Sequence, residues 1–304
     1  MKQIGIVMII IVFALQCTQR TVVRVEKPAT APEMLLKPVA PVAEDDEVVE
    51  TFVDGKIDWG CGIIKAKGTG VVDPNNPNKP QARLMAQRAA IVVAQRNLLE
   101  LIKGVRVTSE TYVEDYMAKS DLIHTRVQGV VKGAKQIGEP KYDEEQGVVE
   151  VELGVYLYEA KGLCDAIISL SAPLSTEYED LTPRAKELLQ KYSGVVFDAS
   201  DVGLKPSMFP KIYDEDGNLI LDTRTYFEKK TEYGRRFVQY IKNLDKILNN
   251  PELKDNPLII KIKDIRGKLG SDIVISKKDA DRYKWLKDIF HFLLKAGRIF
   301  VKTL

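Results

Sequence analysis

The stretch from Pro80 to Gly104, PQARLMAQRAAIVVAQRNLLELIKG, constrains the fold more than any other part of this 304-residue chain. It predicts one helix over residues 81–103, which Gly104 ends. On a helical wheel the small residues gather on one side and bulkier residues form a second row. The small ones are Ala82, Ala86, Ala89, Ala90 and Val93, continued by Asn97, and the bulkier ones are Leu84, Ile91, Leu98 and Ile102. A small-residue face lets a helix lie close to a sheet, so we expect a core helix.

The arginines of this helix argue against a second interpretation, a basic face for phosphates. Arg83, Arg88 and Arg96 fall at about 0°, 140° and 220° on the wheel, so they form no stripe. The whole chain is nearly neutral as well, with 45 Lys and Arg against 43 Asp and Glu. Neither feature indicates a nucleic-acid partner.

Strand-like runs surround the helix and define a first module over residues 56–160. One strand is expected over 59–73, and three more begin at Val105, Thr125 and Gly147, the last two separated by a hairpin at PKYDEEQ. The order is β-α-β-β-β. We therefore expect a helix packed on an antiparallel sheet, within an α+β fold class overall.

A junction over residues 161–180 leads to a second module over 181–304. Thr182 and Pro183 are typical of a helix start. The following elements make a mixed α/β module: a buried strand at 194–199, a hairpin closing at Asp214 to Asn218, a mixed helical stretch at 226–248, strands at 256–267 and 272–276, a helix at 277–296 and a final strand at 298–304.

The N-terminus predicts export. Lys2 precedes an apolar run of twelve residues from Ile4 to Leu15. At about 1.5 Å per residue, this run is too short to cross a bilayer of roughly 30 Å as a helix. It fits the apolar region of a secretory signal peptide, over residues 1–17, better than a buried N-terminal helix or strand.

Cys17 ends this signal in the stretch FALQC, which resembles the lipobox of bacterial lipoproteins. The resemblance implies lipidation of Cys17 and therefore a membrane anchor. Two positions depart from the usual pattern: Ala14 stands where leucine is usual, and Gln16 stands where a small residue is usual. The alternatives are an ordinary exported protein that is cleaved nearby and a short uncleaved anchor.

Residues 18–55 are predicted to form a tether. The segment contains Pro28, Pro32, Pro38 and Pro41, followed by the acidic run EDDEVVE. Prolines fix the backbone and remove hydrogen-bond donors, so a coil that spans about 35 Å is expected here. Such a tether would hold a folded domain clear of the lipid surface.

The residues that catalysis or metal binding needs do not converge in this sequence. His124 and His291 are far apart, and neither has a cysteine or a second histidine at metal-ligand spacing. The loop YDEDGN places Asp214 and Asp216 before Gly217, but Ile212 stands where a calcium loop needs its first oxygen ligand. We therefore predict no enzyme, no cofactor and no metal site.

Cys61 and Cys164 remain once Cys17 is set aside. They flank the first module, and in an oxidising compartment they are a candidate disulfide. The alternative is two buried free thiols, because sequence alone does not fix the distance between them.

Residues 59–158 resemble the lipoprotein-20 family of bacterial envelope proteins. The resemblance rests on IIKAKGTG and on the helix residues Ala86, Ala89, Ala90, Ala94, Arg96, Asn97 and Leu98, followed by Gly104 and Val105. Related domains occur in the flagellar assembly proteins P and T. The family has no known catalytic residues, so the resemblance implies a structural role. The second half resembles a domain that often follows the first one in bacterial lipoproteins.

The sequence thus predicts an exported, lipid-anchored protein of the bacterial cell envelope, facing the periplasm from the outer membrane. It is expected to act by contact with envelope or flagellar proteins, or with further copies of itself, as a flagellar accessory or basal-structure component. The alternative is a periplasmic binding module for peptidoglycan or another envelope ligand.

The lipid anchor can be tested directly. Metabolic labelling with a palmitate analogue should mark the wild-type chain and should not mark the Cys17→Ala variant, because the thiol that accepts the lipid is gone. Equal labelling of the two chains would contradict the anchor.

Overall fold

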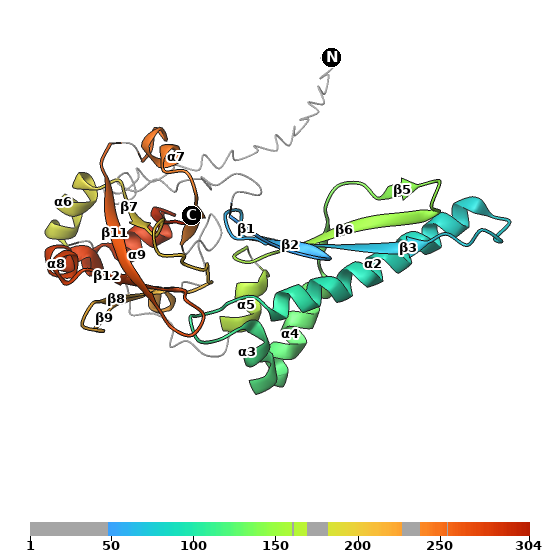
Figure 1. Cartoon of the computed structure of the whole chain (residues 1–304), viewed down its shortest axis with the longest axis horizontal. Coiled ribbons are helices and arrows are strands. Elements are labelled where there is room, and N and C mark those ends of the chain that lie inside the picture. The colour runs from blue at the N-terminus through green and yellow to red at the C-terminus, as the bar shows by residue number, and fades with distance from the viewer. Residues whose placement is uncertain (1–47, 160, 169–181, 227–237, 254) are drawn as a thin grey trace, which may run out of the picture.

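A computed structural model describes residues 48–159, 161–168, 182–226, 238–253 and 255–304. Two modules lie end to end, each built on its own sheet (Figure 1). The predicted α+β class, with an antiparallel sheet in the first module and a mixed sheet in the second, is confirmed. The predicted signal peptide, Cys17 and most of the predicted tether lie outside the described residues.

The first module has a sheet in the order β1-β2-β3-β6-β4, with β5 also paired to β6. Its helices lie between β3 and β4 and after β6. The strands are β1 (Val49–Phe52), β2 (Gly55–Asp58), β3 (Ile63–Val71), β4 (Lys135–Gln136), β5 (Lys141–Asp143) and β6 (Val148–Tyr156), and the helices are α2 (Lys79–Lys103), α3 (Val113–Lys119), α4 (Asp121–Lys132) and α5 (Leu163–Ile168). The hairpin predicted at PKYDEEQ joins β5 to β6.

Strand β1 begins inside the segment predicted as tether. It pairs antiparallel with β2, and Val48 just before it is buried in the core. Glu50 accepts a hydrogen bond from the indole Nε1 of Trp59 at 2.9 Å. The prediction of a coil is therefore wrong for the last residues of this segment. Its prolines and acidic residues indicated a coil, but contacts with the rest of the first module order its end.

Helix α2 lies directly on the backbone of β3. Most of the side chains that it buries recur every four residues along one line, Ala82, Ala86, Ala90, Ala94, Leu98 and Ile102, and Leu101 is buried beside the end of this line. This line faces Gly68 and Gly70. A Cβ atom at Gly68 would lie 2.2 Å from the carbonyl oxygen of Ala90, and one at Gly70 would lie 2.0 Å from that of Ala86. The predicted core helix is therefore confirmed, with glycines on the strand matching alanines on the helix.

The predicted faces of α2 were partly wrong. Ala89, expected on the small-residue face, is exposed, and Leu84, expected to fill the edge, is 60% exposed. The buried line follows a strict four-residue spacing and is narrower than the predicted face. Leu84 lines a hollow with Tyr142 and Val149 of strands β5 and β6 and does not pack against the core.

The strands predicted to begin at Val105 and Thr125 are wrong over most of their length. Residues 113–119 and 121–132 form helices α3 and α4, and the extended parts are the isolated bridge between Arg106 and Tyr112 and the strand Lys135–Gln136. Ser120 caps α4 by accepting a hydrogen bond from the backbone N–H of Ile123. Ile123, Val127 and Val131 are buried at four-residue spacing, which is a helical period. The valines of these runs had suggested alternation instead.

The second module has a sheet in the order β10-β13-β7-β11-β12-β8-β9, in which β10, β13, β7 and β11 are mutually parallel. Its elements are α6 (Pro183–Lys191), β7 (Gly194–Asp198), β8 (Lys211–Asp214), β9 (Leu219–Asp222), η1 (Thr223–Tyr226), β10 (Gln239–Ile241), α7 (Asp245–Leu248), β11 (Pro257–Arg266), β12 (Asp272–Ile275), α8 (Lys277–Arg282), η2 (Lys284–Asp288), α9 (Phe290–Lys295) and β13 (Ile299–Lys302). The Thr182 cap, the hairpin after β8 and the final strand are confirmed.

Three predictions for this half need correction. The stretch 226–248 contains a strand, β10, besides the short helix α7, and residues 227–237 lie outside the described part. The helix predicted over 277–296 is divided into α8, η2 and α9. Tyr283 and Trp285 touch at 5.9 Å, a contact that two residues i and i+2 would not make on a continuous α-helix. In the predicted junction, residues 163–168 form the buried helix α5.

The two modules share one continuous core through the segment after α2. Arg106, only 7% exposed, donates from Nε to the carbonyl oxygen of Pro206 at 2.7 Å and forms an ion pair with Glu50. Its guanidinium also lies 5.5 Å from the ring centroid of Trp59. Burial lowers the pKa of Arg106, opposed by nearby Tyr240 and Tyr112.

Further contacts at the side chains of Asp272 and Tyr240 stabilise the same junction. The Ser109 hydroxyl donates to the buried carboxylate of Asp272 at 2.5 Å, and the Lys211 backbone N–H donates to the other oxygen at 2.8 Å. The Tyr240 hydroxyl donates to the Ser207 carbonyl at 2.8 Å, and the ring of Tyr240 meets Trp59 edge-on at 6.1 Å. Burial raises the pKa of Asp272 despite these hydrogen bonds.

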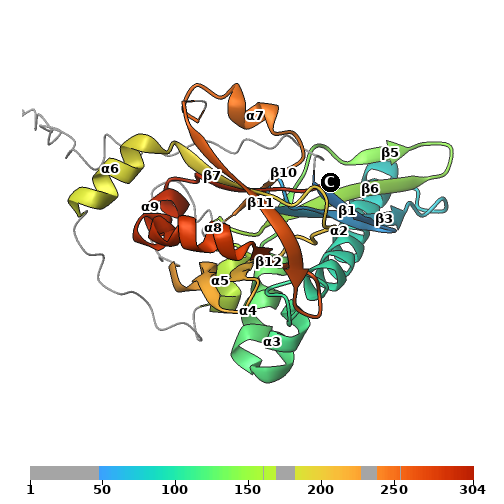
Figure 2. The same cartoon turned by 60° about the vertical axis from the view of Figure 1, so that its left-hand side comes forward.

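An arm projects from this junction, formed by α2, β3, β5 and β6, as Figures 1 and 2 show. Its far end carries the start of α2, the turn after β3 and the β5–β6 hairpin. No helix among the described residues is both long enough and apolar enough to span a membrane.

The close contact between α2 and β3 predicts a large effect of one methyl group. Gly68→Ala should lower the free energy of unfolding by at least about 2 kcal/mol, because backbone atoms of α2 occupy the space and cannot rotate away. Gly129→Ala in α4 is the matched control: nothing lies within 4 Å of its Cβ position, so it should stabilise by about 0.5–1 kcal/mol. Urea unfolding measures both, and equal stability of the two variants would contradict this packing.

Candidate functional site

A hollow of about 400 Å³ lies at the far end of the arm, where α2 meets β5 and β6. Its lining residues are Pro80, Arg83, Leu84, Gln87, Pro140, Tyr142 and Val149. The guanidinium of Arg83 lies 4.2 Å from the Tyr142 ring centroid, and Arg83 also pairs with Glu144 at 3.2 Å. Both side chains of this ion pair are well exposed. The pair therefore orients the Arg83 side chain but contributes little to the stability of the fold.

Apolar side chains extend from this hollow along the arm. Five large apolar or aromatic side chains of the arm are exposed: Val71, Leu84, Met85, Val92 and Tyr142. Of these five, Leu84 and Tyr142 line the hollow. Single exposed apolar residues are normal on a protein surface, but apolar side chains that line a hollow are typical of a contact site. The arm end is therefore one candidate site.

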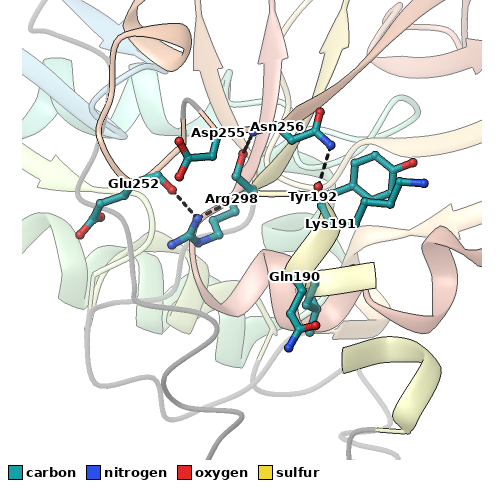
Figure 3. A pocket seen from close by; sticks show the side chains of 9 residues that line it. Gln190, Lys191, Tyr192, Glu252, Asp255, Asn256 and Arg298 are labelled. Atoms are coloured by element: carbon teal, nitrogen blue, oxygen red, sulfur yellow. Dashed lines mark hydrogen bonds between the residues drawn. The ribbon is translucent and has the colours of Figure 1, made fainter. Parts of the chain in front are cut away.

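A second hollow, of about 410 Å³, lies at the amino ends of the parallel strands β7, β11 and β13 (Figure 3). It is polar. The lining comprises Leu189, Gln190, Lys191, Tyr192, Ser193, Glu252, Asp255, Asn256 and Arg298. Ligands of open α/β sheets bind at the carboxyl ends of the strands, so this polar hollow lies at the opposite edge from the usual place.

Arg298 forms the floor of the polar hollow. Its Nη1 donates to the carbonyl oxygens of Ser193 and Glu252, each at 2.8 Å, and thereby joins the start of β7 to the loop before β11 (Figure 3). The Asn256 amide donates to the Lys191 carbonyl at 2.7 Å. Burial lowers the pKa of Arg298, and the negative charge of Glu252 only partly opposes this effect. These bonds shape the hollow and leave the exposed carboxylates and amides at its rim to meet a ligand.

The carboxyl ends of the same strands hold a compact ionic cluster. Ser200 donates from its hydroxyl to Asp198 at 2.5 Å, and Lys302 contacts both residues. Burial disfavours the charged form of Asp198, but the hydrogen bonds from Ser200 and the charge of Lys302 outweigh it and lower the pKa of Asp198. A serine nucleophile needs a neighbouring base, whereas the Ser200 hydroxyl here donates to a carboxylate that is already paired with Lys302. The cluster is therefore an ion pair with a bridging hydroxyl.

The candidate disulfide residues lie in the same region of the fold. Leu157 donates its N–H to the Gly62 carbonyl, and its own carbonyl accepts from the Cys164 N–H, both at 2.8 Å. Cys61, next to Gly62, and the buried Cys164 thus approach the end of β6, but both are thiols in this structure. The disulfide stays a prediction for the oxidised protein.

The remaining residues considered from the sequence are dispersed. His124 is exposed on α4 and contacts Gln128 at 2.9 Å, whereas His291 packs on Phe292 in α9. Asp214 accepts hydrogen bonds from Asn218 and closes the β8–β9 turn. Among the described residues, no group of three or more His, Cys, Asp or Glu side chains is placed to hold a metal ion.

The fold defines a two-module α+β protein, and the described residues include an apolar hollow on the first module and a polar hollow on the second. Residues 194–301, a little over a third of the chain, match the model of a protein family described as Treponema pallidum Tp0624, second domain. The match begins at β7 and ends in β13, so it covers the sheet of the second module. No curated protein matches the chain. The match lies outside residues 59–158 and does not test the lipoprotein-20 resemblance.

Sequence reasoning missed both hollows. The arm-end hollow combines α2 with β5, about sixty residues further along the chain, so no local pattern marks it. Arg298 did carry a signal, because a charged residue directly precedes the buried strand β13. A buried arginine needs partners, and this position could have indicated a polar site.

The packing of His291 predicts a pH dependence of stability. Burial, helped by Lys295, lowers the pKa of His291 to about 4 from 6.5. Between these values the unfolded chain binds a proton that the folded chain does not, so stability falls as the pH drops from 6.5 to 4. His291→Gln should remove about 2 kcal/mol of that loss. Urea unfolding of both chains at pH 7 and pH 4 measures the difference, and equal pH slopes would contradict it.

Proposed function

We propose that this chain is an exported bacterial envelope protein that is anchored through Cys17 and acts by protein–protein contact. The apolar end of the arm is the observation on which the contact role depends. The apolar run before Cys17 and the resemblance of FALQC to a lipobox support export and anchoring at the periplasmic side of the outer membrane.

The arm end has the composition of a contact surface. Protein interfaces have an apolar centre with aromatic, methionine and arginine side chains enriched, and a polar rim. Here Leu84 and Tyr142 line the hollow together with Arg83 and Gln87, and Met85 is exposed on the same turn of α2. The arm holds this surface away from the second module, where a partner can reach it (Figure 1).

The specific form of the proposal is a flagellar accessory or basal-structure role. It rests on the resemblance of residues 86–105 to the lipoprotein-20 family, whose related domains occur in flagellar assembly proteins. A partner can be an envelope or flagellar protein or another copy of this chain, and the same apolar surface serves either case.

The polar hollow supports a second candidate function, binding of an envelope ligand such as a peptidoglycan fragment. Its rim presents carboxylates from Glu252 and Asp255 beside the amides of Gln190 and Asn256 (Figure 3). Such groups hydrogen-bond the hydroxyl and amide groups of a glycopeptide. Sedimentation with purified peptidoglycan tests this function, and loss of binding in Glu252→Ala/Asp255→Ala would favour it over the first.

A complementation assay tests the contact role. In a strain that lacks the chain, the double variant Leu84→Asp/Met85→Asp should fail to restore swimming, because one carboxylate enters the lining of the hollow and a second replaces an exposed apolar side chain on the same turn of α2. The matched control is Leu219→Asp/Leu248→Asp, two exposed leucines of the second module, which should restore swimming as the wild type does. Both pairs are exposed, so the unfolding free energy should change little.

Two outcomes of the same assay would contradict the proposal. Normal swimming and intact flagella in the deletion strain would refute the flagellar role. Full complementation by the arm variant would refute the arm end as the contact surface, while leaving the anchor to be judged by the Cys17→Ala labelling.

A further inference from the structure

The exposed sides of α6, α8 and η2 carry an excess of positive charge. We call this surface the basic helical face. Its exposed cations are Arg184, Lys186, Lys191, Lys277, Lys278, Arg282, Lys284 and Lys287, and its exposed acids are Glu187, Asp281 and Asp288. Asp279 of α8 is half-buried, and Lys277 forms an ion pair with Asp216 at 2.6 Å, so seven of these cations have no ion-pair partner among the described residues. The whole chain has a net charge of only +2. The rest of the chain is therefore net negative, and the near-neutral composition conceals a strong asymmetry.

Aromatic residues join the helices of the basic helical face into one surface. Tyr192, at the end of α6, stacks on Trp285 of η2 with ring centroids 5.0 Å apart and planes 14° apart. Trp285 in turn meets Tyr283 edge-on at 5.9 Å. Figure 1 shows α6 and α8 at the same end of the second module, away from the arm. Cations from distant parts of the sequence thus lie on one side of the second module.

Cations and rings are also paired locally. The Lys191 ammonium lies 5.4 Å from the Tyr192 ring centroid, and the Arg282 guanidinium lies 5.3 Å from that of Tyr283. All three aromatic rings are half-buried. Half-buried tyrosine and tryptophan flanked by lysine and arginine are typical of the water–lipid boundary.

We propose that the basic helical face binds the anionic phospholipid surface of the membrane that holds the chain. This inference rests on the proposed function, because the Cys17 anchor brings the protein to that membrane. A tether raises the local concentration of the lipid headgroups, so weak electrostatic contacts suffice. The face lies at the opposite end of the molecule from the arm (Figure 1). Binding there directs the arm end away from the lipid and towards a partner.

Vesicle flotation tests this with the full chain. The probes are vesicles of phosphatidylcholine alone and vesicles with about a third phosphatidylglycerol, an anionic content high enough for polybasic binding. The wild type should prefer the anionic vesicles by at least about ten-fold in affinity, and high salt should abolish the preference. The apolar run near the N-terminus is present in every arm of the experiment, so the ratio between vesicles isolates the charge effect.

Two triple variants with the same net charge change locate the effect. Arg282→Glu/Lys284→Glu/Lys287→Glu should lose the preference for anionic vesicles. Lys79→Glu/Lys132→Glu/Lys141→Glu, three exposed lysines of the first module, should keep most of it. Thermal unfolding of both variants checks that each is folded, and single reversals at Lys284 and Lys287 replace the triple variant if it is not.

Three results would overturn the proposal. These are no preference of the wild type for anionic vesicles, an equal loss in both triple variants, and binding to an acidic polypeptide such as polyglutamate without binding to vesicles. The last result would identify an acidic protein as the partner of the face. Equal palmitate labelling of wild type and Cys17→Ala would refute the anchor alone, and the vesicle preference would still be read independently.

Discussion

The buried guanidinium of Arg106 is the interaction on which the rest of the structure depends. Placing a charge in a protein interior is costly unless hydrogen bonds and an opposite charge compensate it. Arg106 obtains these partners from both modules, through Glu50 on β1 and the Pro206 carbonyl. Trp59 covers the guanidinium from the side and also meets Tyr240. The two sheets are therefore fixed to each other by a site that neither could satisfy alone, and the arm and the basic helical face keep a defined separation.

Several local elements could be predicted because each has a signal within a few residues. The alanines of α2, the Thr182 cap, the apolar strand β7 and the Asp214–Asn218 turn all behave as their sequences indicate. Helices α3 and α4 were predicted as strands because the valines of these segments also fit the alternation of a β-strand. The four-residue spacing of Ile123, Val127 and Val131 is the signal that indicates a helix in this segment. The end of the predicted tether is ordered by tertiary contacts, which local composition cannot reveal.

The functional surfaces could not be predicted for a different reason. The arm-end hollow, the polar hollow and the basic helical face each combine segments that are about sixty to one hundred residues apart in the chain. Composition averages over such distances, and the near balance of charge concealed a face with eight exposed cations. Only the fold brings these residues together. The sequence therefore predicted the α+β fold class but not the surface sites.

The position of β13 has a consequence for how the chain is made. It is the last strand of its sheet in chain order, yet it lies in the interior, between β7 and β10. The parallel ladder cannot close until residues 299–302 are available, and such long-range pairing forms slowly. During synthesis the second module thus stays incomplete until nearly its whole length has emerged. For the export proposed above, this delay would keep the module in the unfolded state that a translocation channel for unfolded polypeptides requires.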